Sequence, residues 1–267
     1  MLLIFLIISV LISALICILA GYTGLTLAGF FLLFTLAGIA GLLLLYILFV
    51  GALSLFINRS KVETENHPFY RFILVETVQM VLFLSGARIH AEGLELLPDG
   101  AFFLAGNHRS GFDPLIAVYA LRKRNLCFIS KPSNFRIPIG GALMHKTGFL
   151  AIDRDDDRKA LRTILAAADR MKRGVACFGV YPEGTRSRTE KMLPFRNGCF
   201  KAAQRAQVPI VVASVRNTEK IVRNCPWRIT AVIFRICGVI DAATVATEKT
   251  AELGDQVRAM LEANLAQ

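Results

Sequence analysis

The first 58 residues of this 267-residue chain contain no Asp, Glu, Lys, Arg or His. One straight helix over this segment would be about 87 Å long, whereas the hydrocarbon core of a bilayer is about 30 Å thick. The segment therefore has to turn back on itself, and Gly21-Tyr22-Thr23-Gly24 is the natural break. We expect two helices, Leu2–Ala20 and about Gly29–Ile57, that form a membrane-embedded hairpin.

A cleaved signal peptide fits this segment poorly, because no basic residue precedes the apolar run and the run is too long. Two crossings put both ends of the hairpin on one side, and Arg59 and Lys61 favour the cytoplasmic side. We therefore predict an integral protein of the cytoplasmic membrane whose larger part faces the cytoplasm. The second helix is longer than one crossing, which leaves tilt, a re-entrant hairpin or a partly interfacial helix open.

The apolar run Pro68–Leu84 carries Arg71, Glu76 and Gln79 and is too polar for a third span. Pro68 is a favourable first helical residue, and Gly86 is suited to end the helix. This helix either lies on the membrane or packs against the following domain as an ordinary core helix.

Every charged side chain lies at Arg59 or later, so the net charge of +11 belongs to that part of the chain. A basic domain tied to an apolar anchor suits membrane lipids or a phosphorylated substrate. Nucleic acid is disfavoured, because membrane tethering keeps the domain away from it and no recognition pattern is present. The six cysteines include no C-x-x-C pair, which is typical of a reducing compartment.

From Arg88 onward, short apolar runs alternate with amphipathic ones, which predicts an α/β domain with a largely parallel mixed sheet covered by helices. The expected strands are Ala101–Ala105, Leu126–Ile129, Phe149–Ile152, Val175–Val180, Ile210–Val215 and Ile229–Ile240. Expected helices cover residues 160–171, Gly198–Gln207 and Leu253–Ala266. We divide the chain into the hairpin (1–58), a linker with an amphipathic helix (59–87) and the domain (88–267).

The first polar motif runs from Asn107 to Pro114, just after the expected strand that ends at Ala105. His108 thus lies at the carboxyl end of a strand, where open α/β sheets usually bind ligands. A neutral imidazole can accept a hydroxyl proton, and a carboxylate such as Asp113 can fix its tautomer. A plain helix N-cap for Asp113 and a structural loop position for His108 fit the same residues.

The second polar motif, Tyr181–Arg188, follows the expected strand Val175–Val180, so both loops can share one edge of the sheet. Gly184 allows close approach of the backbone, and Arg186 offers a planar fork for phosphate or carboxylate. A self-contained polar turn in which Glu183 pairs with an arginine is the alternative.

Together, N-H-x-x-x-x-D and the later P-E-G-T-R resemble the glycerolipid acyltransferase family, specifically the 1-acylglycerol-3-phosphate (lysophosphatidic acid) acyltransferases. Gly148–Arg154 resembles the family's G-x-x-F-I-D-R block, with Ala151 where Phe is usual. Val208–Val211 resembles its V-P-I-V-P block, with Val212 replacing the second proline. In the K-x-E-L-x-x-x-P run of many relatives, this chain keeps the lysine (Lys131) and the proline but lacks Glu-Leu, which leaves the acceptor open.

The resemblance implies direct acyl transfer from acyl-CoA or acyl-carrier protein to lysophosphatidic acid, forming phosphatidic acid in phospholipid biosynthesis. His108 would take the proton of the acceptor hydroxyl, and Asp113 would orient His108. The residues that the resemblance assigns to substrate binding are Lys131, Arg154, Glu183, Gly184, Thr185 and Arg186. Among them, Lys131 and Arg186 would hold the acceptor phosphate, backbone N–H groups near Gly184 would face the oxyanion, and Glu183 would brace its loop.

No cofactor and no metal are expected, because His108 and His145 are not at ligand spacing and the acidic cluster Asp153–Asp157 is typical of a solvated turn. The basic residues between Leu121 and Lys146 suit either helix capping and solvation or a docking surface for an anionic donor. An enzyme of the same family with another acceptor, such as glycerol 3-phosphate, another lysophospholipid or a lipid precursor, remains an alternative. A non-catalytic lipid-binding protein is a second one.

Overall fold

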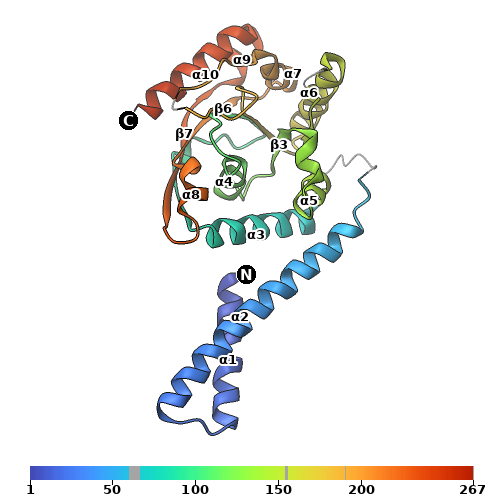
Figure 1. Cartoon of the computed structure of the whole chain (residues 1–267). Helices are drawn as coiled ribbons and strands as arrows, with labels where there is room; N and C mark the ends of the chain where they lie inside the picture. Colours follow the sequence, from blue (N-terminus) through green and yellow to red (C-terminus); the bar gives the residue numbers. More distant parts are fainter. Residues whose placement is uncertain (60–66, 154–155, 190, 267) are drawn as a thin grey trace. The chain divides into compact units, whose positions relative to one another are not determined.

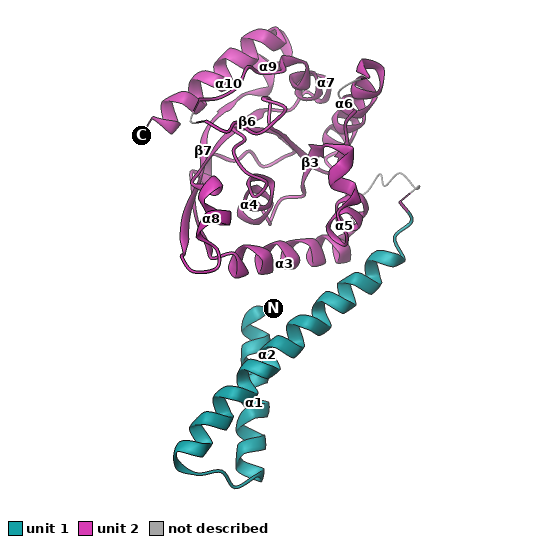
Figure 2. Ribbon diagram, in the orientation of Figure 1, with its two compact units in different colours: residues 1–58 teal, residues 59–267 magenta. Residues whose placement is uncertain are grey.

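The computed structural model describes residues 1–59, 67–153, 156–189 and 191–266. Two compact units make up the chain, residues 1–58 and residues 59–267 (Figure 2). Lys61, used above to orient the hairpin, and Arg154, assigned to substrate binding, lie outside the described residues.

Unit 1 is a pair of helices, α1 (Leu2–Leu19) and α2 (Gly24–Leu55). The break falls at the predicted Gly-rich turn, but α2 begins at Gly24, which adopts a φ of +56°, rather than near Gly29. Both helices are long and apolar enough to cross a membrane, by length and composition alone. The 32 residues of α2 span about 48 Å, more than the hydrocarbon core of about 30 Å.

The two helices pack closely through small and aromatic side chains. A Cβ built on Gly38 would lie 2.9 Å from Ser9 Oγ, so glycine allows the close approach of the helix backbones. The rings of Phe5 and Tyr46 meet edge to face, with their centroids 6.3 Å apart. These contacts make unit 1 the expected antiparallel hairpin (Figure 1).

Unit 2 is built on a mostly parallel seven-stranded sheet in the order β1-β7-β6-β2-β5-β3-β4. All neighbouring strands are parallel except β6 and β7, which are antiparallel. The strands are β1 (Ala87–Glu92), β2 (Phe103–Gly106), β3 (Leu126–Ser130), β4 (Leu150–Ala151), β5 (Cys177–Val180), β6 (Ile210–Arg216) and β7 (Thr230–Ile240). The α/β fold predicted from the alternation of apolar and amphipathic runs is therefore confirmed.

Six strands lie where the apolar runs predicted them, and β1 is the one that was missed. Its sequence, Ala-Arg-Ile-His-Ala-Glu, lacks a continuous apolar run. The strand occupies an edge of the sheet, pairs with β7 alone and leaves Arg88 and His90 exposed. An edge strand needs only half of its residues to be apolar, so its sequence signal is small.

Helices cover both faces of the sheet (Figure 1). One layer contains α6 (Asp157–Lys172), α7 (Lys201–Ala206), α9 (Ala242–Thr247) and α10 (Thr250–Leu265). The other contains α3 (Pro68–Leu84), α4 (Asp113–Ala120) and α5 (Gly140–Lys146). Short segments complete the unit: η1 (Leu94–Leu96), η2 (Pro132–Arg136), η3 (Asn197–Phe200), η4 (Thr218–Lys220) and α8 (Ile221–Asn224).

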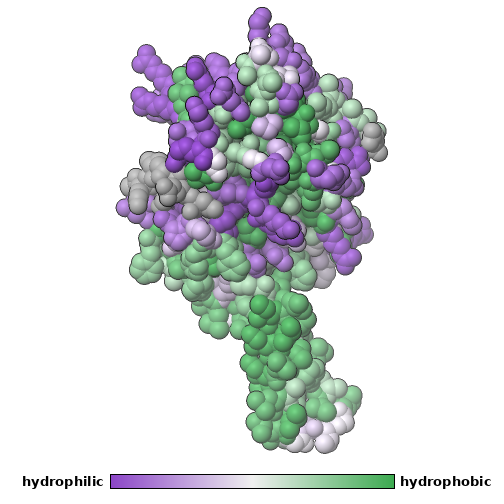
Figure 3. All heavy atoms as spheres, turned by 180° about the vertical axis from the view of Figure 1, so that it is seen from behind, coloured by the Kyte–Doolittle hydropathy of each residue, from purple (hydrophilic) through white to green (hydrophobic). Residues whose placement is uncertain are grey.

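Helix α3 packs on the sheet domain with one face and exposes apolar side chains on the other. The buried guanidinium of Arg71 donates to the carbonyl oxygens of Leu126 (2.8 Å) and Arg124 (2.9 Å), which ties α3 to the start of β3. On the outer face, Phe72 and Phe83 remain 53% and 66% exposed. Figure 3 shows hydrophobic residues along this edge of unit 2. The packing of α3 against the following domain is therefore confirmed, and its position on the membrane stays a prediction.

Candidate active site

Two polar loops leave neighbouring strands at the same edge of the sheet. β2 ends at Gly106 and pairs in parallel with β5, which ends at Val180. His108 follows β2 and Tyr181 follows β5, so the two motifs found in the sequence start side by side. Backbone contacts join the loops, because Ser187 N donates to His108 O at 2.8 Å.

The imidazole of His108 is held by the carboxylate of Asp113. His108 Nδ1 lies 2.8 Å from Asp113 Oδ2, and the His108 side chain is 19% exposed. The same oxygen accepts hydrogen bonds from the backbone N–H groups of Arg109 (2.7 Å) and Ser110 (2.8 Å). Because an ionised carboxylate only accepts, Nδ1 carries the proton and Nε2 is left with a free lone pair.

Two further contacts, neither predicted from the sequence, fix this loop to β6 and to the turn that follows β6. Thr218 Oγ1 donates to Asp113 Oδ1 at 2.5 Å. The Asn107 side-chain amide forms two hydrogen bonds with the backbone of Val215, at 2.8 and 2.9 Å. The carboxylate of Asp113 is thus bonded through both of its oxygens and is fully buried.

Glu183 joins three segments of the site. Its Oε1 accepts a hydrogen bond from His108 N (2.7 Å), and its Oε2 accepts one from Leu193 N (2.8 Å). The side chain is only 4% exposed, and among the described residues it has no ion pair with an arginine. Glu183 therefore braces the backbone around His108.

A row of stacked rings crosses the sheet behind His108. The imidazole stacks on Tyr181 (centroids 4.3 Å apart, 11° between planes), and Tyr181 stacks on Phe128 (5.3 Å, 16°). A Cβ on Gly179 would lie 2.6 Å from the Phe128 ring, and one on Gly106 would lie 3.5 Å from the Tyr181 ring and 2.7 Å from a backbone oxygen of β6. Gly179 therefore leaves the space that the Phe128 ring occupies, and Gly106 allows the close approach of the β6 backbone.

The hydroxyl of Tyr181 is buried and has no hydrogen-bond partner among the described residues. Burial, and secondly the negative charge of Asp113, raise the pKa of Tyr181 well above its ordinary value. The phenol is therefore neutral at physiological pH. Burial likewise raises the pKa of Cys127 and of Cys199 to about 12, so neither thiol is an activated nucleophile.

Four of the predicted substrate-binding residues line one cavity of about 490 Å³, and Arg186 lies elsewhere. Lys131, Glu183, Gly184 and Thr185 border this cavity together with Arg196, and we call it the lysine cavity. Arg186 does not line it, and its guanidinium lies beside the His108 loop: a Cβ on Gly111 would be 3.9 Å from Arg186 Nη1.

The backbone N–H groups near Gly184 differ in whether they already have an acceptor. Gly184 adopts a φ of +72°, and its own N–H already donates to Tyr181 O at 2.9 Å. Among the described residues, the N–H groups of Thr185 and Arg186 have no hydrogen-bond acceptor. These two groups are free donors beside Gly184.

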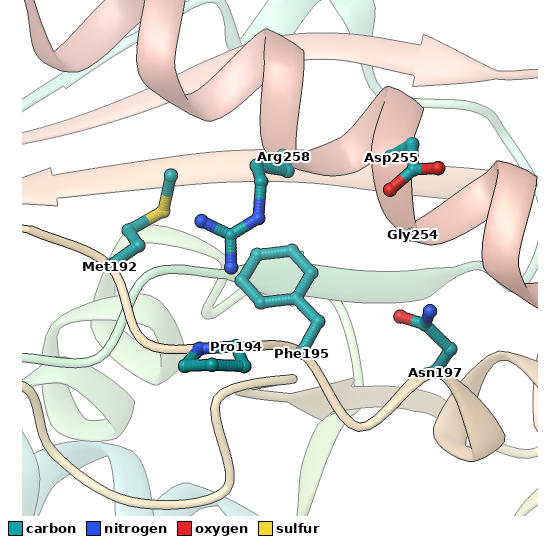
Figure 4. Close-up of a pocket in the computed structure, with 7 residues that line it drawn as sticks. All are labelled: Met192, Pro194, Phe195, Asn197, Gly254, Asp255 and Arg258. Atoms are coloured by element: carbon teal, nitrogen blue, oxygen red, sulfur yellow. The ribbon is translucent and has the colours of Figure 1, made fainter.

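Helix α10 holds the segment that contains Leu193 (Figure 4). The guanidinium of Arg258 lies 4.4 Å from the centre of the Phe195 ring and donates to Leu193 O. The segment and α10 enclose a cavity of about 360 Å³. Because Leu193 N in turn donates to Glu183, Arg258 supports the brace of the His108 loop, a role that no sequence pattern indicated.

The arrangement is suited to proton abstraction from an alcohol. A histidine with an accepting Nε2 lies near a cavity that contains Lys131 and Arg196, which are able to attract an anion. Among the described residues, Ser110 Oγ has no hydrogen bond with His108 and accepts one from Phe112 N, so the pair is not arranged as a nucleophile and its base. In the part of the chain that the structure describes, no group of three or more His, Cys, Asp or Glu side chains is arranged to hold a metal ion.

Comparison with known proteins agrees with these motifs. The chain matches the Acyltransferase family over residues 88–216. It is 33% identical over 167 residues to a 1-acyl-sn-glycerol-3-phosphate acyltransferase of Salmonella typhimurium, an alignment that covers 62% of this chain and 67% of that protein. The enzyme of the same name from Escherichia coli is 31% identical over the same shares.

A solved structure extends the fold likeness to most of the chain. The 1-acyl-sn-glycerophosphate (LPA) acyltransferase PlsC from Thermotoga maritima superposes with a TM-score of 0.64 at 22% identity. The superposition covers 83% of this chain and 88% of that one. At this identity the likeness concerns the fold.

Proposed function

The chain belongs to the family of the 1-acyl-sn-glycerol-3-phosphate acyltransferases, and from this premise we propose that it acylates the free hydroxyl of 1-acylglycerol 3-phosphate. The product would be phosphatidic acid, and the acyl donor would be acyl-CoA or acyl-carrier protein. The observation that carries the proposal is the pair His108–Asp113, which leaves Nε2 as a proton acceptor in a loop joined through Glu183 to the lysine cavity.

In the proposed reaction, His108 Nε2 takes the proton of the acceptor hydroxyl while its oxygen attacks the thioester carbonyl carbon. The negative charge moves to the carbonyl oxygen, and the C–S bond then breaks as the carbonyl re-forms. The imidazolium returns its proton to the departing thiolate, so the products are the ester and a free thiol. Asp113 stabilises the imidazolium throughout.

The charges around His108 suit the two anionic parts of the transition state. Lys131 and Arg186, with Arg154 as a further candidate, would hold the acceptor phosphate. The free N–H groups of Thr185 and Arg186 would donate to the developing oxyanion, in place of the occupied Gly184 N–H. The donor is a substrate, and the proposed transfer uses no cofactor or metal.

We also propose that unit 2 lies on the cytoplasmic face of the cytoplasmic membrane. The two apolar helices of unit 1 support membrane association, and Arg59 after α2 favours the cytoplasmic side. An apolar patch of unit 2 supports contact with lipid: Phe72 and Phe83 of α3 are exposed, and Trp227 is 90% exposed. The end of α3 touches the Trp227 segment, since a Cβ on Gly86 would lie 3.2 Å from Arg228 O.

A substrate panel with the purified full-length protein tests the proposal. Acyl-CoA and acyl-carrier protein are each combined with 1-acylglycerol 3-phosphate, glycerol 3-phosphate and an uncharged lysolipid, and thiol release and lipid product are measured. We expect transfer to 1-acylglycerol 3-phosphate to have the highest kcat/KM. Preference for another acceptor would reassign the substrate, and no acceptor-dependent thiol release would favour a lipid-binding protein.

A further inference from the structure

A second cavity, of about 240 Å³, also borders Glu183. Its lining includes four basic side chains, Arg109, Lys191, Arg216 and Lys220, and we call it the arginine cavity. Pockets for whole drug-sized ligands measure about 300–1,000 Å³, so this cavity suits one charged group of a larger molecule.

The positive charge of the arginine cavity is largely unpaired. Two carboxylates line it: Glu183 accepts hydrogen bonds through both oxygens, and Glu219 lies 3.7 Å from Arg109 Nη2. Among the described residues, neither Lys191, Arg216 nor Lys220 has an ion pair. Lys220 Nζ donates only to the neutral side chain of Asn217 (2.8 Å).

A buried donor in the same cavity also lacks its acceptor. Arg109 Nε is shielded from solvent and has no hydrogen-bond partner in the described part of the chain, and the same holds for the acceptor Glu219 Oε2. Unmade hydrogen bonds of buried donors cost about 1–3 kcal/mol, more for charged groups, so such a donor indicates a missing partner. An anion in this cavity would supply an acceptor for Arg109 Nε and offset part of the charge of the three unpaired cations.

The arginine cavity adjoins the catalytic loop but is separate from the lysine cavity. Asn107 and Arg109, the neighbours of His108, line it, as does Ser187, whose N–H donates to His108 O. Among all residues that line the arginine cavity, only Glu183 also lines the lysine cavity. An anion bound here would therefore flank His108 from a second position.

We propose that the arginine cavity binds a phosphate of the thioester donor. The inference rests on the proposed function, in which both substrates are phosphorylated and the acceptor phosphate is assigned to Lys131 and Arg186. Acyl-CoA carries a phosphate in its pantetheine arm and others on its nucleotide, whereas the carrier protein's prosthetic group has only the first. Binding of either phosphate in the arginine cavity anchors the donor while its thioester reaches His108.

A series of acyl donors that differ in their phosphate groups tests the assignment with the full-length enzyme. KM is measured for acyl-CoA, acyl-phosphopantetheine and acyl-pantetheine, which carries no phosphate, at a fixed concentration of 1-acylglycerol 3-phosphate. The variants are Arg216→Gln and Lys220→Gln, and Arg162→Gln on the exposed face of α6 is the matched control. In each variant we expect the KM advantage of acyl-CoA over acyl-pantetheine to shrink roughly tenfold, the loss expected for one hydrogen bond to a charged group.

Acyl-phosphopantetheine then identifies the phosphate. Its KM should rise in parallel with that of acyl-CoA if the cavity holds the pantetheine phosphate, and stay constant if it holds a nucleotide phosphate; both results support the assignment. An unchanged KM ratio, an equal change for all donors, or a rise confined to the acceptor KM would overturn it. A wild-type enzyme that transfers from none of the donors would instead refute the proposed function.

Discussion

Thr218 and Asp113, which are 105 residues apart in the chain, meet at the centre of the site, where the threonine hydroxyl donates to the carboxylate at 2.5 Å. This contact holds the oxygen of Asp113 that does not face His108. The orientation of the imidazole therefore depends on the turn that follows β6. We expect Thr218→Val to lower kcat roughly tenfold with little change in either KM, because the carboxylate loses one fixed hydrogen bond. Thr218→Ser keeps the hydroxyl and should restore most of kcat.

His108 should dominate catalysis without supporting the fold. His108→Ala removes the proton acceptor, and kcat should fall roughly 100- to 10,000-fold, the usual contribution of general acid–base catalysis. His90→Ala, on the exposed edge strand β1, is the matched control and should leave kcat unchanged. Activity of His108→Ala close to that of the wild type, in protein with an unchanged unfolding temperature, would exclude the proposed mechanism.

Two variants of Tyr181 separate the effect of its ring on kcat from the effect of its hydroxyl on stability. Tyr181→Phe keeps the stack under His108 and removes a buried hydroxyl without a partner, so kcat should be retained and the unfolding temperature should rise by about 2–4 °C, which is about 1 kcal/mol. Tyr181→Leu removes the stacked ring and should lower kcat. A wild-type enzyme more stable than Tyr181→Phe at neutral pH would show that the hydroxyl is bonded.

The same phenol predicts a pH dependence of stability. The pKa of Tyr181 is raised in the folded state, whereas an unfolded tyrosine ionises near pH 10. Its contribution is therefore complete below about pH 10 and is lost as the pH rises further. The unfolding temperatures of wild type and Tyr181→Phe, measured in detergent from pH 7 to 11, should diverge above pH 10, with the wild type falling faster.

Arg258 should act on turnover from outside the site. Arg258→Gln removes its contacts with the Phe195 ring and Leu193 O and loosens the segment that holds Glu183, so kcat should fall by up to about tenfold. Arg205→Gln, exposed on α7, is the control. Equal kcat in both variants would mean that Glu183 holds its position without α10.

The chain's only tryptophan, Trp227, reports whether unit 2 touches lipid. In lipid nanodiscs its fluorescence should be quenched by brominated acyl chains and protected from an aqueous quencher, because tryptophan favours the membrane interface. Fluorescence that the aqueous quencher suppresses fully would show that the apolar patch of α3 and Trp227 does not contact the membrane.

The sequence alone was sufficient for those features that depend on short stretches. Buried strands such as Ile210–Arg216 contain short runs of consecutive apolar residues, and the loops of His108 and Glu183 follow such runs directly. The catalytic and binding roles of these residues stay predictions until the variants are measured. Edge strand β1 escaped detection because polar side chains interrupt its apolar residues.

The supporting contacts could not be predicted, since they join distant segments. Asn107 meets Val215 across 108 residues, and Arg258 meets Leu193 across 65. No local periodicity records which asparagine or arginine will find a backbone partner that far away. For a related reason the sequence did not tell which N–H groups near Gly184 are free: the acceptor of the Gly184 N–H, Tyr181 O, depends on the left-handed turn at Gly184 itself.

Gly106 and Gly179 have no side chain to offer a substrate, yet the aromatic row behind His108 requires the empty Cβ position of Gly179, and the approach of β6 to β2 requires that of Gly106. Even alanine at Gly179 would push against Phe128, and the displacement would pass through Tyr181 to the imidazole plane. A survey of this protein's variants that scored only polar positions would miss them. Inactivating changes should therefore also arise where nothing is lost and a single methyl group is gained.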